Sequence, residues 1–121
     1  MPVDNAAKVA RVHQYMEAVS TGNLDLIRDI YADNATVEDP VGTPAHSGIE
    51  AILKFYGAFK GLGVTTELTG PIRCAGNAAA FSFDARVGPG RIEVIDVFEF
   101  NDEGKVVSMK AYWGPENRHA N

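Results

Sequence analysis

The sequence predicts an α+β fold in which three N-terminal helices pack in a curved, mostly antiparallel sheet, forming a conical barrel with a deep apolar pocket. Three observations lead to this prediction. Up to about residue 59 apolar residues recur mainly at helical spacing, whereas from residue 64 onward they alternate as in strands. Gly, Pro and Asn clusters separate the strand-like segments, which is typical of an antiparallel meander beside helices. The length of 121 residues favours one domain over residues 1–121.

The three predicted helices have recognisable starts and ends. Asp4 or Asn5 can cap the first helix, and Gly22 can close it. Asn23 can cap the second helix. The third opens on Ser47-Gly48-Ile49-Glu50, which has the pattern of a capping box. The apolar stripes of the three helices are Val9, Val12, Met16 and Val19; Leu24, Ile27, Ile30 and Tyr31; and Ile49, Ile52, Tyr56 and Phe59.

Six strands complete the predicted fold. Residues 35–39 form a short strand with Val37 and Asp39 on one face, and Pro40 ends it. The other five strands cover residues 64–69, 72–75, 78–87, 91–100 and 105–113. A sheet bent around helices leaves an open end, so a pocket is expected there.

Charge and composition exclude several classes of protein. A formal net charge of -5 with scattered Lys and Arg argues against nucleic acid or anionic membranes as partners. No apolar run approaches 18 residues, and the N-terminus lacks the pattern of a secretory signal. The single Cys74 forms no internal disulfide, which fits the cytoplasm.

The most informative stretch is the predicted strand 91–100. Its even positions carry four apolar residues around one acid, Asp96, so that acid points into the core. Burial disfavours the charged form of a carboxyl group, so an unpaired Asp96 is expected to have a raised pKa. Those four apolar residues are Ile92, Val94, Phe98 and Phe100.

Asp39 and Tyr15 accompany Asp96 as candidate site residues. Asp39 lies on the core side of its strand, immediately before the loop where a pocket rim is expected, and Tyr15 lies on the inward face of the first helix. A structural role is the alternative for each: a buried acid commonly pairs with Arg, Lys or backbone NH groups, and Asp before Pro often starts a turn. Tyr15 alone would be ordinary core material. Two inward acids beside one inward tyrosine favour acid–base chemistry.

Other chemistries lack their motifs. The three histidines do not have metal-ligand spacing, and one cysteine supplies no thiolate cluster, so no metal site is predicted. No Gly-rich phosphate loop and no Gly-x-Ser-x-Gly elbow is present.

Three segments resemble the bacterial Δ5-3-ketosteroid isomerases. They are YADNATVEDPVG at residues 31–42, VIDVF at 94–98 and KVVSMKAYWG at 105–114, and the similarity runs in order from Tyr15 to Asn117. One departure is visible, because the connection 86–91 is shorter than the corresponding hairpin in the family. That shortening leaves the catalytic positions in place but affects the outer wall of the pocket.

The resemblance implies a reaction. Asp39 matches the general base that moves a proton from C4 to C6 of a Δ5-3-ketosteroid through a dienolate, giving the Δ4-3-ketosteroid. Tyr15 and Asp96 match the two donors of the oxyanion hole, and a protonated Asp donor beside an Asp base is already known for ketosteroid isomerases. Tyr31 and Tyr56 match supporting tyrosines behind Tyr15. Trp113 matches an aromatic residue whose indole NH can position the base, and no metal, flavin or nicotinamide cofactor is implied.

Two further expectations follow, and two alternatives stay open. The exposed face of strand 91–100 carries Ile95 and Val97, which favours a homodimer, as does the resemblance. The fold itself also hosts dehydratases, cyclases and epoxide hydrolases, and noncatalytic proteins that bind hydrophobic ligands. The expected partner is therefore a small-molecule steroid, with another small hydrophobic substrate or ligand as the alternative.

Overall fold

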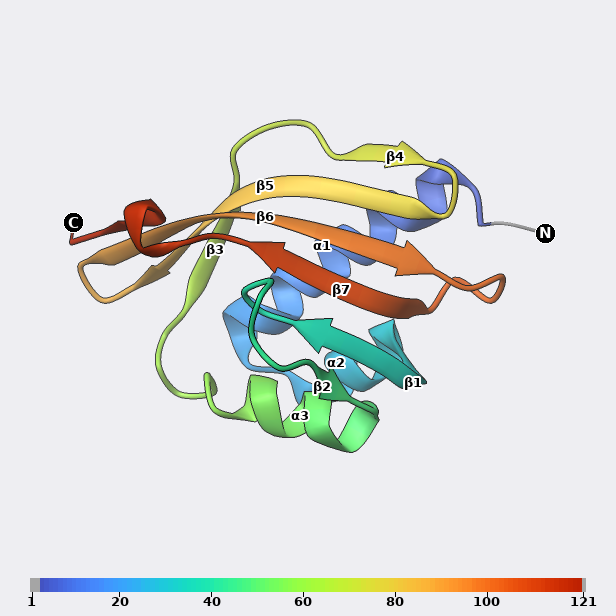
Figure 1. Cartoon of the computed structure of the whole chain (residues 1–121), viewed down its shortest axis with the longest axis horizontal. Coiled ribbons are helices and arrows are strands. Elements are labelled where there is room, and N and C mark those ends of the chain that lie inside the picture. The colour runs from blue at the N-terminus through green and yellow to red at the C-terminus, as the bar shows by residue number, and fades with distance from the viewer. Residues whose placement is uncertain (1–2, 121) are drawn as a thin grey trace.

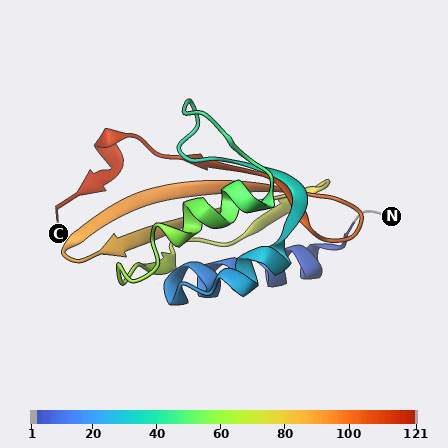
Figure 2. The same ribbon diagram turned by 90° about the horizontal axis from the view of Figure 1, so that it is seen from below.

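Three α-helices pack on one side of a curved, mixed sheet (Figures 1 and 2). The structure is a computed structural model that describes residues 3–120. No helix in this part of the chain is long and apolar enough to cross a membrane. The helices are α1 (Asn5–Thr21), α2 (Leu24–Ile30), α3 (Ile49–Gly57) and the short 3₁₀ helix η1 (Pro115–Asn117). The strands are β1 (Tyr31–Glu38), β2 (His46–Ser47), β3 (Thr65–Leu68), β4 (Arg73–Ala75), β5 (Ala78–Val87), β6 (Gly90–Phe100), β7 (Val106–Tyr112) and β8 (Arg118–His119).

The sheet has the strand order β2-β1-β7-β6-β5-β3, with β4 added to β5 and β8 added to β6. All strand pairs are antiparallel except β1 and β7, which are parallel. Between these two strands the chain passes through α3 and the meander, so that β7 runs in the same direction as β1. The prediction of an α+β fold is confirmed. The prediction of three N-terminal helices in a conical barrel is not: β1 and β2 precede α3, and the edge strands β2 and β3 leave the described sheet unclosed.

The predicted ends of the first two helices are largely confirmed. Asp4 caps α1, where its Oδ1 accepts a hydrogen bond from the Ala7 backbone NH at 2.8 Å. Gly22 ends α1 with φ 68, a left-handed conformation that glycine adopts without a Cβ penalty. Asn23 caps α2 through its side-chain oxygen.

Three details of the helix prediction are wrong. Tyr31 is not helical but begins β1, because α2 ends at Ile30. The capping box at Ser47 does not form either, since Ser47 pairs with Thr36 in the sheet and Gly48 precedes α3 at φ 89 with no side-chain cap. Phe59, expected on the third helix, lies in the turns beyond its end at Gly57.

The meander matches the prediction closely. Strand β5 has the predicted limits, and β6 starts one residue early, at Gly90. Val87 pairs with Gly90, so the β5–β6 connection is a two-residue turn in which Gly88 has φ 56. The even positions of β6 face the core, and Val94, Asp96, Phe98 and Phe100 are buried.

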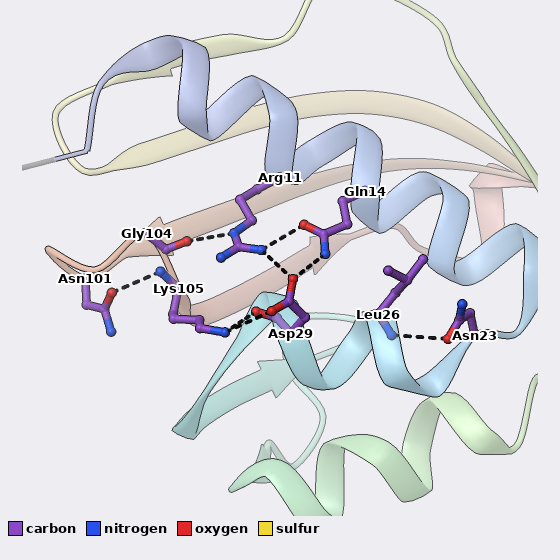
Figure 3. Close-up of polar contacts among 8 residues, drawn as sticks. All are labelled: Arg11, Gln14, Asn23, Leu26, Asp29, Asn101, Gly104 and Lys105. Atoms are coloured by element: carbon purple, nitrogen blue, oxygen red, sulfur yellow. Dashed lines mark hydrogen bonds and ion pairs between the residues drawn. The ribbon is translucent and has the colours of Figure 1, made fainter.

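A polar cluster joins α1, α2 and the β6–β7 turn (Figure 3). We call it the Asp29 cluster; it consists of Arg11, Gln14, Asp29 and Lys105. The Asp29 carboxylate accepts hydrogen bonds from Gln14 Nε2 at 2.8 Å and Arg11 Nη1 at 3.2 Å. Lys105 Nζ binds both the backbone carbonyl and the carboxylate of Asp29, and Arg11 Nε donates to the Gly104 carbonyl at 2.9 Å. These contacts stabilise the end of the molecule at which α1 begins.

Candidate active site

A cavity of about 220 Å³ opens among α1, α3, the meander strands and the chain after β7. Most of its wall is apolar. Its polar lining includes two carboxyl groups, those of Asp39 and Asp96, and one guanidinium, that of Arg118. The hydroxyl-bearing Tyr15 and Tyr56 also line it. A largely apolar cavity with a few converging polar groups is the usual form of a small-molecule site. The apolar lining is Val19, Phe55, Phe59, Val64, Phe83, Ala85, Val87, Ile92, Val94 and Trp113.

Asp96 is buried in the middle of β6, with 1 % of its surface exposed. It pairs with Phe81 on one side and Ala111 on the other. Within residues 3–120 neither of its carboxyl oxygens has a hydrogen-bond partner. Burial raises the pKa of Asp96 well above its ordinary value, the charge of Asp39 raises it further, and the nearness of Tyr15 offsets only part of this.

Three buried tyrosines form a hydrogen-bonded chain that ends in the cavity. The hydroxyls of Tyr31 and Tyr56 are 2.7 Å apart, and the Tyr56 hydroxyl donates to that of Tyr15 at 3.2 Å. Burial raises the pKa of all three, which keeps them protonated. Because Tyr15 accepts from Tyr56, its own hydroxyl hydrogen stays available as a donor. The Tyr15 and Phe98 rings pack in a T-shaped arrangement, with centroids 5.1 Å apart.

Asp39 and Trp113 meet because their strands are parallel neighbours. Asp39 directly follows β1 and Trp113 directly follows β7, and Glu38, the last residue of β1, pairs with Lys110, two residues before the end of β7. Trp113 Nε1 donates to Asp39 Oδ1 at 2.7 Å. Burial raises the pKa of Asp39, while this hydrogen bond and the charge of His46 lower it in part. The carboxylate is therefore held in place and is more basic than an exposed Asp.

The structure brings most of the predicted site residues together. Tyr15, Asp39, Asp96, Tyr56 and Trp113 all line the cavity. The sixth, Tyr31, is not part of the lining, but its hydroxyl is hydrogen-bonded to that of Tyr56, which is. In the described part of the chain, no three His, Cys, Asp or Glu side chains lie close enough together to hold a metal ion.

Sequence reasoning missed three residues around the cavity. Phe55 lines it, and its position three residues after Ile52 is a helical signal that was available. His46 packs against Phe55 with ring centroids 4.5 Å apart and the ring planes tilted by 31°, but the two-residue strand β2 has no periodicity to reveal this. Arg118 lies in the equally short β8, which likewise left no pattern.

Comparison with known proteins is consistent with this geometry. The model of the SnoaL-like domain matches residues 12–109. The chain is 42 % identical over 110 residues to a protein from Nocardioides simplex named steroid Delta-isomerase, covering 88 % of this chain and 89 % of that one. It also superposes with a TM-score of 0.90 on SalBIII, an epoxide hydrolase/cyclase-like enzyme with a role in pyran ring formation in the polyether salinomycin; the two are 28 % identical, and 98 % of each chain is covered.

Proposed function

We propose that this chain, which belongs to the SnoaL-like domain family and resembles its steroid isomerases, is a steroid Δ5-isomerase. It would move a proton from C4 to C6 of a Δ5-3-ketosteroid and give the Δ4-3-ketosteroid. One observation carries the proposal: Asp96, which has no hydrogen-bond partner within residues 3–120, and the Tyr15 hydroxyl line the same apolar cavity as Asp39. Trp113 Nε1 donates to Asp39 Oδ1 at 2.7 Å.

The proposed mechanism begins at Asp39. A proton alpha to a ketone is weakly acidic, and its removal places negative charge on the carbonyl oxygen as the dienolate forms. Asp39, with its pKa raised by burial, takes the C4 proton as the general base and then delivers it to C6. One carboxylate serves both carbons, so the proton stays within the cavity and no other acid is needed.

Tyr15 and Asp96 stabilise the dienolate oxygen. A buried tyrosine and a protonated Asp can each donate a hydrogen bond to that oxygen, in a cavity where little water competes. The raised pKa of both groups keeps their protons in place. The Tyr31–Tyr56 chain donates toward Tyr15, which orients its hydroxyl and strengthens it as a donor.

The direct test is incubation of the pure protein with 5-androstene-3,17-dione. The proposal expects the absorbance of a conjugated enone to grow, and the Asp39→Asn variant to be nearly inactive. A wild-type rate no higher than that of buffer would overturn the proposal.

An epoxide hydrolase or cyclase is the second candidate, because SalBIII shares the fold over 98 % of both chains. Such an enzyme would use Asp39 to activate water or a hydroxyl group, and Asp96 to protonate the epoxide oxygen. Turnover of an epoxide ketone without isomerisation of the steroid would favour this reading.

The proposal includes a homodimer that works in the cytoplasm. Ile95 and Tyr112 are cross-strand neighbours on β6 and β7, and they are 49 % and 47 % exposed. Apolar side chains that lie side by side on an outer sheet face favour burial against a second copy. Light scattering should give twice the chain mass of 13.0 kDa at micromolar concentration, and a monomer mass would overturn this part of the proposal.

A further inference from the structure

One cation lies at the rim of the apolar cavity, and the proposed mechanism does not use it. Arg118 is in β8, which pairs with the beginning of β6. Ile92 is its partner, and paired residues of antiparallel strands project from the same sheet face. Both side chains accordingly line the cavity. His119, the next residue, projects to the other face and contacts Glu93 Oε1 at 2.7 Å.

The guanidinium of Arg118 is held in place, but no carboxylate among the described residues neutralises it. It lies over the Trp113 ring, 5.4 Å from the ring centroid. The preceding turn is fixed by two hydrogen bonds between Gly114 and Asn117, at 2.8 Å and 2.9 Å. Within residues 3–120 Arg118 makes no ion pair. Arg11, Arg28, Arg86 and Arg91, by contrast, each have an Asp or Glu partner.

Arg118 lies far from the groups that would hold the ketone. Its partner Ile92 precedes Asp96 by four residues, which corresponds to about 13 Å along a strand. A rigid substrate whose ketone reaches Tyr15 and Asp96 therefore presents its opposite end toward Arg118. A guanidinium offers a planar pair of NH donors that matches a carboxylate, and within residues 3–120 no Asp or Glu forms an ion pair with it.

We propose that Arg118 is a specificity-determining residue that selects substrates bearing a carboxylate at the end remote from the reacting ketone. This inference rests on the proposed function, because it takes the orientation of the substrate from Tyr15 and Asp96. The preferred substrates are then 3-ketosteroid acids rather than neutral diones.

The test measures binding, so it does not depend on turnover. The probes are 3-oxo-4-androstene-17β-carboxylate and its methyl ester, which already carry the product double bond. Wild type should bind the acid about fivefold to tenfold more tightly than the ester, as expected for a partly exposed charge pair. Raising the salt from about 0.05 to about 0.5 M should weaken binding of the acid alone.

The Arg118→Met variant should bind both probes equally, and Arg118→Lys should keep part of the preference. The matched control is Arg73→Met, an exposed arginine on β4 outside the cavity, which should keep the full preference. Equal binding by wild type, absence of binding of both probes, or a preference that survives in Arg118→Met would each overturn the inference. If Arg118→Met weakened the binding of both probes equally, the inference would also be overturned, since Arg118 would then only support Trp113.

The outcome is separate from that of the proposed function. An enzyme that isomerises the neutral dione but shows no preference for the acid refutes only the role of Arg118. A protein that prefers the acid probe but does not isomerise 5-androstene-3,17-dione refutes the isomerase and supports the carboxylate site. The salt dependence is measured on wild type, so it decides the matter even where a variant does not fold.

Discussion

The Asp29 cluster and the cavity lie toward opposite ends of the molecule, and they shift the pKa of a carboxyl group in opposite directions. In Figure 1 the β6–β7 turn beside Asp29 lies near the N-terminus, whereas the β5–β6 turn beside the cavity lies near the C-terminus. Asp29 is surrounded by donors from Arg11, Gln14 and Lys105, which lower its pKa. Asp96 has no such partner among the described residues, and burial raises its pKa.

This difference separates a structural acid from a functional one. Side chains of the folded protein donate the hydrogen bonds that the Asp29 carboxylate accepts, so Asp29 needs no ligand. A buried polar group without a hydrogen-bond partner lowers the free energy of unfolding by about 1–3 kcal/mol. Such a group calls for an explanation, and a ligand that supplies the missing hydrogen bond is one. A ketone oxygen that becomes an anion would be such a partner for Asp96. Substitutions at the cavity are thus expected to change turnover, and those at Asp29 only stability.

The largest effect is expected from Asp39→Asn. The amide keeps the size of the side chain and can still accept the Trp113 hydrogen bond, but it cannot take a proton. The value of kcat should fall by about 10² to 10⁴. Steady-state kinetics with 5-androstene-3,17-dione measures this, with circular dichroism as the check on folding. Near-normal turnover in a folded variant would contradict the assignment of the base.

Tyr15→Phe should have the next largest effect. It removes one donor to the dienolate oxygen and keeps the ring packed on Phe98, so kcat should fall by about 10² to 10³ with little change in KM. Tyr31→Phe is the matched control, since it removes a hydroxyl at the far end of the same chain and should cost less. If Tyr15→Phe raised KM alone, Tyr15 would be a binding contact.

Asp96→Asn tests the protonation state at the cavity end. The fold raises the pKa of Asp96. Below the unfolded pKa of about 3.9 its carboxyl group is therefore protonated in both the folded and the unfolded state, and its contribution to the free energy of unfolding is at its full value. As the pH rises, the unfolded chain releases the proton first. Wild type should therefore lose stability relative to Asp96→Asn by up to about 1.4 kcal/mol per pH unit, until the folded pKa is passed.

Denaturant unfolding of both proteins between pH 5 and 9 measures this difference. Asp39 is present in both, so its own titration largely cancels. A wild type that lost no stability relative to Asp96→Asn as the pH rose would show that Asp96 is an ordinary carboxylate. The oxyanion hole would then require another donor.

Part of this arrangement could be predicted from sequence because local physics decides it. The caps at Asp4 and Gly22 depend on neighbouring residues alone. The inward position of Asp96 follows from strict alternation along a strand of eleven residues. Whether Asp96 finds a partner depends on residues far away in the chain, so the sequence left both a structural and a catalytic role open.

The errors arose where tertiary pairing overrides a local pattern. Tyr31 fits the apolar spacing of a helix, yet it begins β1 and pairs with Val106 of β7. Ser47 has the residue type of a helix cap but pairs with Thr36 instead. Arg118 and His46 lie in strands of two residues, which are too short to show alternation. Their positions near the cavity follow only from the strands that they join.

Asp29→Asn is expected to have the smallest effect and the opposite dependence on pH. The Asp29 side chain is 58 % exposed, so solvent screens its ion pairs, and their loss should cost only about 0.2–1 kcal/mol at neutral pH. Its pKa is lowered by Gln14 and Arg11, so the stability that it adds is present above the unfolded pKa and is lost as the pH falls through the folded value. Unfolding of wild type and Asp29→Asn between pH 3 and 7 should show the two proteins converging toward acid, and converging also as salt is added at pH 7. Turnover should remain unchanged, because Asp29 lies outside the cavity lining. If Asp29→Asn lowered kcat tenfold, or if its difference from wild type grew toward acid, the separation between a structural end and a functional end would fail.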